Sequence, residues 1–258
     1  MYLSYMIKVV LFGSGNVAYH LAKAFRLAND IHLVQLYRRN SKNDHLFDIK
    51  IPKTNSLNEI KKADVYILAI NDDHIAAFSK DLKFEEGLVA HTSGSISLDQ
   101  LKCKAHKGIF YPLQTFSKDQ KLTYKTIPFC LETEYPKDME ILKALARSIS
   151  ENVYEINSVQ REKLHIAAVF TNNFSNHMFK IAKDICDEHQ ISFELLKPLI
   201  LNTANKINYL DPVDAQTGPA KRNDQNVIQK HLEQLQGDKK EIYSLISKSI
   251  IKTYLKEL

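Results

Sequence analysis

A glycine-rich turn near the start of the chain constrains the fold more than any other feature. Residues 13–18 (GSGNVA) follow an apolar run over residues 7–12 and open a helical pattern. Gly13 permits a tight turn, Gly15 lets the backbone approach a pyrophosphate, and Ala18 lets the helix pack closely on its strand. The N-terminus of that helix would offer unpaired N–H groups to the anion. The pattern therefore predicts a strand–turn–helix unit that binds a dinucleotide, and the alternative is a glycine-rich turn that binds nothing.

The residues after the second apolar run, 31–37, indicate which dinucleotide is bound. Proteins that bind NAD place an acidic residue there for the ribose 2′-hydroxyl, whereas this chain has Arg38, Arg39, Asn40 and Ser41. Guanidinium groups suit the 2′-phosphate of NADP because they form paired, charge-assisted hydrogen bonds with phosphate. We therefore predict NADP rather than NAD, with a preference of about 10- to 100-fold. A solvated basic turn is the alternative.

The third buried run, residues 65–70, ends at the turn Asn71-Asp72-Asp73. Ligands of open α/β sheets bind at the carboxyl ends of the strands. We expect the backbone at this turn to line the cofactor crevice, and Asp72 and Asp73 to cap the helix that follows. The residues predicted to bind the cofactor are Gly13, Ser14, Gly15, Asn16, Val17, Arg38, Arg39, Asn40, Ser41, Ala69, Ile70 and Asn71.

Short apolar runs alternate with helical patterns in the first 156 residues, and only helical patterns follow. Apolar strands separated by helices indicate a mostly parallel sheet covered on both faces. We therefore predict an α/β, Rossmann-type domain over residues 1–156 and an all-α domain for dimerisation and substrate binding over residues 157–258. The expected strands are 7–12, 31–37, 65–70, 88–91, 108–111, 127–131 and 153–156. The expected helices are 17–27, 57–62, 74–81, 98–102, 137–150, 158–190, 193–209, 224–236 and 239–258.

Apolar residues recur at spacings of three and four in the C-terminal helices, which predicts apolar stripes. A helical domain of this kind would not complete its own core, so we expect a homodimer formed largely by these helices. One stripe comprises Ala167, Phe170, Phe174, Met178, Ile181 and Ile185, and the other Ile242, Leu245, Ile246, Ile250, Ile251, Tyr254 and Leu255.

Composition excludes several classes of protein. The chain has 258 residues, 44% hydrophobic and 25% charged, which is typical of a globular protein. Lys and Arg outnumber Asp and Glu by only 35 to 30, so we expect no nucleic-acid partner. No apolar run approaches the roughly 20 residues of a membrane span, and the N-terminus lacks a signal-peptide pattern. Three distant cysteines and scattered histidines indicate neither disulfides nor a metal site, so we expect a cytoplasmic protein without a metal.

Four segments resemble those of one protein family: GSGNVAYHLA (13–22), HTSGS (91–95), YPLQTFS (111–117) and TGPAKRND (217–224). The family comprises Rossmann-like NADP oxidoreductases with a C-terminal helical domain of unknown function. It is distantly similar to pyrroline-5-carboxylate reductase, the β-hydroxyacid dehydrogenases and the deazaflavin-dependent NADP reductases. The resemblance implies a helical domain that mediates dimerisation and closes the active-site cleft. It implies no substrate, because fold alone does not establish function.

Two groups of side chains are candidates for catalysis. His91 and Ser93 follow a strand and could face the nicotinamide, or they could hold the loop or bind the cofactor instead. At about 100° per residue, His165, Asn172 and Asn176 share one face of a helix, with Asn173 at its edge. A stripe of His and Asn is unusual on a solvent face, so it is predicted to line the cleft; a solvated or dimer-facing stripe is the alternative.

Charged residues nearby could bind a substrate. Lys163 precedes the His and Asn stripe and could bind an acidic substrate, although a single surface lysine is more often solvated. Arg222 follows the rigid turn Gly218-Pro219 and could bind a substrate carboxylate or a partner subunit. Asn223 or Asp224 is expected to cap the next helix.

The sequence thus predicts an NADP-dependent oxidoreductase that moves a hydride between nicotinamide and a small carbonyl or imine, or hydroxy or amino, compound. A nucleotide-binding sensor without turnover is the alternative. The β-hydroxyacid dehydrogenases place a catalytic lysine four residues before an asparagine, whereas Val169 precedes Asn173 and Ala168 precedes Asn172 here. This departure favours the sensor, and the His and Asn stripe favours the enzyme.

Overall fold

The computed structural model describes residues 6–39 and 50–254. The chain divides into two compact units, residues 1–173 and 174–258. The first unit therefore holds the sheet together with the first helix after it, α4 (Ser158–Ala168). Asn40 and Ser41, which the sequence predicts as cofactor ligands, lie outside the described residues.

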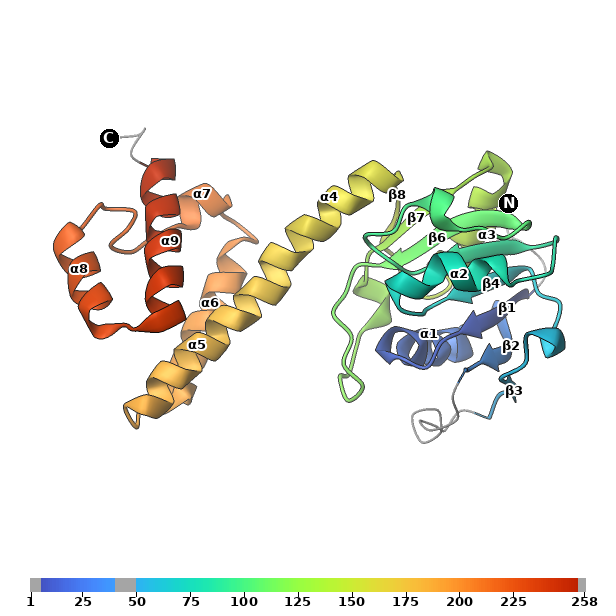
Figure 1. The fold of residues 1–258 in the computed structure, drawn as a ribbon, viewed down its shortest axis with the longest axis horizontal. Coiled ribbons are helices and arrows are strands. Elements are labelled where there is room, and N and C mark those ends of the chain that lie inside the picture. The colour runs from blue at the N-terminus through green and yellow to red at the C-terminus, as the bar shows by residue number, and fades with distance from the viewer. Residues whose placement is uncertain (1–5, 40–49, 255–258) are drawn as a thin grey trace. The chain divides into compact units, whose positions relative to one another are not determined.

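The first unit is built on one sheet in the order β3-β2-β1-β4-β5-β6-β7-β8, shown in Figure 1. Neighbouring strands are parallel except for β6 and β7, which are antiparallel. The mostly parallel, Rossmann-type sheet predicted from the sequence is therefore confirmed. The strands are β1 (Ile7–Phe12), β2 (Ile31–Tyr37), β3 (Lys53–Thr54), β4 (Val65–Leu68), β5 (Leu88–His91), β6 (His106–Pro112), β7 (Phe129–Thr133) and β8 (Val153–Glu155).

The register brings the carboxyl ends of four neighbouring strands to one edge. Phe12 pairs with Leu68, Leu68 with His91, and His91 with Ile109. The chain order also reverses at β1, which has β2 on one side and β4 on the other. Such a reversal is where open α/β sheets hold their ligands.

Helices cover both faces of the sheet because each face presents apolar side chains. On one face, Phe25 of α1 (Asn16–Leu27) and Leu142 of α3 (Pro136–Arg147) are fully buried with Phe110. On the other, Ile75 of α2 (Ile75–Lys80) is fully buried with Phe12. Full burial of each such side chain is worth about 1.5–3 kcal/mol, so these contacts hold the helices against the sheet.

One long helical stretch follows the sheet. Asn157 fixes its start through a capping box, in which the Asn157 side chain accepts from the Gln160 N–H and the Gln160 side chain accepts from the Asn157 N–H. The expected helix 158–190 is found as α4, a π-helical turn at Val169–Phe174 and α5 (Ser175–Glu188). The chain there has one wider turn that the periodicity did not reveal.

The second unit is helical within the described residues. It contains α5, α6 (Lys197–Lys206), α7 (Pro212–Ala215), α8 (Gln225–Gln234) and α9 (Gly237–Tyr254). Asp224 begins α8 by accepting a hydrogen bond from the Val227 N–H, which confirms one of the two predicted caps. Within the described residues, no helix combines the length and apolar character that a membrane crossing requires.

Three local expectations were wrong. The expected helices 57–62 and 98–102 are single 3₁₀ turns, Leu57–Glu59 and Leu98–Gln100, because so few residues cannot repay the cost of nucleating an α-helix. The stretch between α6 and α8 contains the short helix α7, which we had expected to be loop. Proline at its first turn suits a helix start, because that position needs no N–H donor.

Candidate functional site

The glycine-rich turn lies between the ends of β2 and β4. The Gly13 N–H donates to the Tyr37 carbonyl at 3.0 Å, and the Ala69 N–H donates to the Phe12 carbonyl at 2.8 Å. Gly13 has a φ of +135°, and a Cβ there would collide with the Ala69 carbonyl oxygen. Only glycine therefore lets the turn sit this close to the end of β4.

The start of α1 is open to a ligand. Its N-cap residue, Gly15, provides no side chain to accept from the first N–H groups, and the first turn has no acidic residue. A Cβ added at Gly15 would meet nothing within 4 Å. Unpaired N–H groups at the positive end of a helix, with open space before them, fit the pyrophosphate of a dinucleotide.

The other predicted cofactor residues of this turn differ in their surroundings. Ser14 and Val17 are half-buried, whereas Asn16 is exposed and donates through Nδ2 to the Phe116 carbonyl at 2.9 Å. On the same helix, His20 bonds the Ser117 carbonyl through Nε2 at 2.8 Å. The segment after β6 is thus fastened to the nucleotide turn, a link that the sequence did not predict.

The two predicted arginines are not equivalent. Arg38 is 7% exposed and its N–H donates to the Thr54 carbonyl at 2.9 Å. Arg39 is exposed. Both follow β2 directly, and the last residue of β2, Tyr37, is the hydrogen-bond partner of Gly13. The basic residues therefore lie at the edge of the sheet that holds the glycine turn.

Asp72 and Asp73 do not cap the next helix as expected. Asn71 occupies the N-cap position of the 3₁₀ turn Asp72–His74 and makes no side-chain cap. The Asp72 carboxylate instead accepts from the hydroxyls of Ser93 and Ser95, at 2.8 and 2.7 Å. Because both hydroxyls belong to the loop after β5, the Asp72 carboxylate holds this loop in place instead of capping the helix. Ala69 is buried, Ile70 half-buried and Asn71 exposed along the same edge.

The side chains of the candidates His91 and Ser93 both form hydrogen bonds that hold the loop after β5. His91 is 0% exposed, and its Nδ1 accepts from the Ser93 N–H at 3.1 Å. Burial, and after it the charge of Arg161, lowers the pKa of His91 to about 4. Ser93 Oγ accepts from the N–H groups of Ser95 and Ile96. A neutral, enclosed imidazole is a poor proton donor at neutral pH, so these contacts favour the loop-holding alternative.

A second histidine, His165 of α4, contacts Tyr111 of β6 beside this loop. Tyr111 Oη and His165 Nδ1 are 3.2 Å apart. A Cβ on Gly94 would lie 2.5 Å from His165 Nδ1 and 2.9 Å from Tyr111 Oη. Residue 94 must therefore be glycine for β6, α4 and the loop after β5 to meet here. Burial raises the pKa of Tyr111 to about 12, so its hydroxyl keeps its proton at neutral pH.

A pocket of about 340 Å³ lies beside this pair, within the first unit. Its walls come from the end of β6, from α4 and from the π-helical turn. The pocket brings together three of the candidate residues, His165, Asn172 and Asn173, and adds Tyr111, Gln114 and Thr115. One signal for the added residues was present in the sequence, since the segment YPLQTFS begins at the end of a strand. Amides, hydroxyls and an imidazole can donate to or accept from a neutral polar ligand.

The remaining substrate candidates lie elsewhere. Lys163 is exposed on α4 and does not line the pocket. Asn176 and Arg222 are exposed and belong to the second unit. Asn176 follows the π-helical turn, where each residue advances by less than 100°, so the periodicity calculation does not hold across it. Their roles in binding stay predictions.

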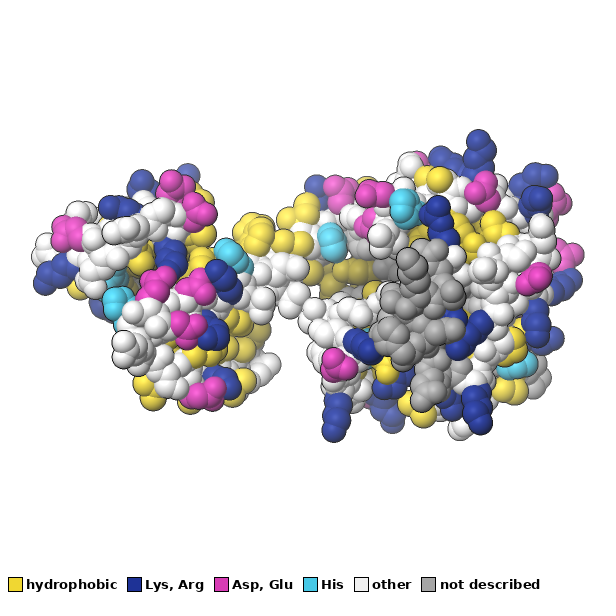
Figure 2. Space-filling model, turned by 60° about the horizontal axis from the view of Figure 1, so that its bottom comes forward, with side chains coloured by type: hydrophobic (Ala, Val, Ile, Leu, Met, Phe, Trp, Pro, Cys, Tyr) yellow, Lys and Arg dark blue, Asp and Glu magenta, His cyan; other side chains and the backbone are white. Residues whose placement is uncertain are grey.

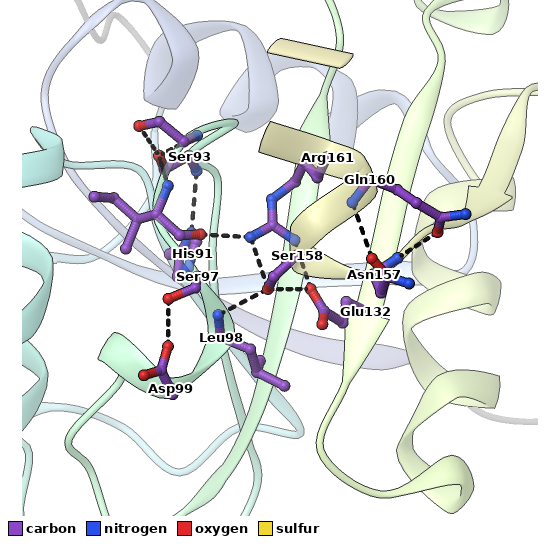
Figure 3. A network of polar contacts seen from close by, with 12 residues as sticks. His91, Ser93, Ser97, Leu98, Asp99, Glu132, Asn157, Ser158, Gln160 and Arg161 are labelled. Atoms are coloured by element: carbon purple, nitrogen blue, oxygen red, sulfur yellow. Dashed lines mark hydrogen bonds and ion pairs between the residues drawn. The ribbon is translucent and has the colours of Figure 1, made fainter. Parts of the chain in front are cut away.

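Arg161 connects the elements around the site (Figure 3). Its guanidinium is 1% exposed, pairs with the Glu132 carboxylate at 2.6 Å and donates to the Ile96 carbonyl. Ser158 Oγ donates to the same carboxylate at 2.7 Å. One buried charge thus joins α4 to β7 and to the loop after β5. A charged residue at a helical position is usually solvated, so this role could not be predicted from the sequence.

Across residues 6–39 and 50–254, His, Cys, Asp and Glu form no group of three that could hold a metal ion. Cys103, Cys130 and Cys186 are buried and free.

The fold and the turn after β1 define a Rossmann-type protein with a helical C-terminal region. A family model described as a domain of unknown function (DUF2520) matches residues 127–250. A crystal structure of a "putative NADP oxidoreductase" from Bacteroides fragilis is 39% identical in sequence, covers 96% of this chain and 98% of that chain, and has a TM-score of 0.87. The chain belongs to the family of this Bacteroides protein, as the four segments had indicated.

More distant structures share the fold. A protein from Thermotoga maritima is 21% identical, covers 96% of this chain and 99% of that chain, and has a TM-score of 0.72. A 1-pyrroline-5-carboxylate reductase from Streptococcus pyogenes is 15% identical, covers 96% of this chain and 98% of that chain, and has a TM-score of 0.67. Among curated proteins, no sequence matches this chain.

Proposed function

We propose that the protein is an NADP-dependent oxidoreductase acting on a small carbonyl or imine compound, or on the corresponding hydroxy or amino compound. One observation carries the proposal: the glycine turn after β1 and the polar pocket after β6 lie at the same edge of the sheet. A family relative named as an NADP oxidoreductase supports the cofactor. When bound, the dinucleotide supplies or accepts the hydride.

The chain's own residues would bind the cofactor in three parts. The N–H groups at the start of α1, next to Gly15, would bind the pyrophosphate. Arg38 and Arg39 would bind the 2′-phosphate by charge-assisted hydrogen bonds. The backbone of residues 69–71 would line the crevice beside them.

Substrate binding would fall to the polar pocket. His165, Asn172 and Asn173 would contact the substrate, and His91 and Ser93 would hold the loop beneath it. Asn176 is a further candidate for contacting the substrate, and Lys163 and Arg222 are candidates for binding an acidic group on it. We also propose that the protein is cytoplasmic and acts as a homodimer formed through its C-terminal helices.

Thermal unfolding and turnover together test this proposal. NADPH should raise the melting temperature by mass action, and a panel of small carbonyl and imine compounds should reveal NADPH oxidation. Gly15→Asp is the matched variant, because its side chain enters open space and can cap α1 itself. It should fold with unchanged or higher stability and lose the NADPH-induced shift.

Three outcomes separate the functions. Absence of any NADPH-induced shift in the wild type would overturn the proposal. A shift without turnover on the whole panel would favour the nucleotide-binding sensor. A shift that survives Gly15→Asp would place the nucleotide elsewhere.

A further inference from the structure

The Tyr111–His165 pair is more enclosed than a surface hydrogen bond. Tyr111 is 8% exposed, yet both side chains line the pocket after β6. Gly94 makes room for both polar atoms, since a Cβ there would lie within 2.9 Å of each of them. Three segments distant in the sequence therefore converge on one hydrogen bond that opens into a polar pocket.

We propose that Tyr111 and His165 form a proton-donating pair for the substrate of this pocket, an inference that rests on the proposed function. When His165 is protonated, its Nδ1–H must donate to Tyr111 Oη, because imidazolium has no acceptor. The Tyr111 hydrogen is then directed away from His165. It can reach the carbonyl oxygen or imine nitrogen of a ligand in the pocket.

The proton transfers balance. A bound reduced dinucleotide would supply the hydride for the substrate carbon, and the substrate oxygen or nitrogen takes the proton of the Tyr111 hydroxyl. The Tyr111 oxygen then takes the Nδ1 proton of His165, and half-buried His165 recovers a proton from solvent. Tyr111 is the catalytic residue of the pair, and His165 supplies its proton.

Charged groups near the pair act in opposite directions. The charge of Arg161 lowers the pKa of Tyr111 and that of Asp72 raises it, while burial remains the largest cause of the raised pKa. Because burial disfavours the Tyr111 anion, Tyr111 needs a neighbour that replaces its proton, and His165 Nδ1, 3.2 Å from Tyr111 Oη, is placed to do so.

The test follows the imidazole signals of His165 by NMR of the full-length protein at one pH, with saturating NADP⁺ and with saturating NADPH. These signals should differ between the two nucleotides, because the positive nicotinamide of NADP⁺ disfavours a second positive charge close to it. His165→Gln identifies the signal. His106 begins β6 at the opposite edge of the sheet from Tyr111 and serves as the internal control.

Each outcome of the NMR comparison either supports or overturns the proposed pair. A difference at His165 without one at His106 supports the pair. Equal signals at His165 with both nucleotides bound would overturn the pair and leave the proposed function standing. If neither nucleotide perturbs the spectrum, both proposals fail together. Tyr111→Phe keeps the ring beside Gly94, and with any compound that the wild type reduces it should lower turnover by about 100-fold or more; full turnover in this variant would exclude Tyr111 as the donor.

Discussion

At the scale of single residues, substitution of Arg38 and Arg39 tests which dinucleotide the protein prefers. Replacing both with Ala should remove the preference for NADPH over NADH, because the 2′-phosphate loses its charge-assisted hydrogen bonds. Since Arg38 is buried, the double variant will also lose stability. The measurement is therefore the difference between the melting temperatures with NADPH and with NADH at equal concentration.

Arg26→Ala is the control for this prediction, because Arg26 is exposed in the last turn of α1, away from the glycine turn. It should retain the wild-type preference. A wild-type protein that prefers NADH, or a double variant whose preference is unchanged, would contradict the assignment of these arginines.

His91 makes stability depend on pH. Its pKa is about 4 in the folded protein, against 6.5 for an ordinary histidine. Between these values the unfolded chain binds a proton and the folded chain does not, so stability falls as pH drops from about 6.5 to about 4. The loss should reach about 3 kcal/mol, and it should be absent above pH 7.

His91→Asn isolates this effect, because an amide oxygen can accept from the Ser93 N–H in place of Nδ1 but cannot titrate. Urea unfolding at a series of pH values should show a shallower acid loss in the variant than in the wild type. Parallel curves for the two proteins would show that His91 is not the group that titrates.

At the scale of elements, the buried ion pair of Arg161 with Glu132 is the contact whose loss should destabilise the site most. Arg161→Met should destabilise the protein by about 3–5 kcal/mol, because the Glu132 carboxylate would remain desolvated without its partner. The double variant Arg161→Met with Glu132→Gln should recover part of this loss. Denaturant unfolding of the wild type, the two single variants and the double variant gives the coupling free energy.

Lys180→Ala provides the comparison for Arg161. Lys180 pairs with Asp184 one turn along α5, but its side chain is 64% exposed. An exposed pair at this spacing is worth about 0.3–0.5 kcal/mol. A loss at Arg161 no larger than this would mean that the buried pair does not hold α4 to the sheet.

The sequence predicted the strands well because their apolar runs are continuous. The bounds of β1, β2 and β5 were predicted to the residue. The two-residue strand β3 was missed, because its pairing with β2 and not an apolar run of its own defines it. The π-helical turn was also missed, since a period of 3.6 residues was assumed throughout.

Only those parts of the candidate site that form local sequence patterns could be predicted. The turn after β1 and the His and Asn stripe are local patterns, so they could be recognised along the chain. The contacts of Tyr111 with His165 and of Arg161 with Glu132 join positions 54 and 29 residues apart. Packing of the sheet against α4 creates these contacts, and no local pattern encodes them.

At the scale of the whole molecule, the second unit leaves apolar side chains uncovered, as Figure 2 shows for one face of the protein. Leu199 of α6 is 60% exposed and Leu245 of α9 is 71% exposed. Large contiguous apolar surface on a folded protein marks a site of association. Ile246 is 42% exposed, whereas Tyr254 is buried, so only part of the predicted C-terminal stripe is available for such a contact.

We expect light scattering to give about twice the chain mass of 29.7 kDa at micromolar concentration, because a homodimer would cover these side chains. Leu199→Lys combined with Leu245→Lys should shift the mass to that of one chain, since two desolvated charges oppose association. Leu27→Lys is the matched control, because Leu27 is 76% exposed at the end of α1, outside the helical unit. It should leave the mass at the dimer value. A wild-type mass near one chain, or a dimer that survives the double substitution, would show that these helices do not form the interface.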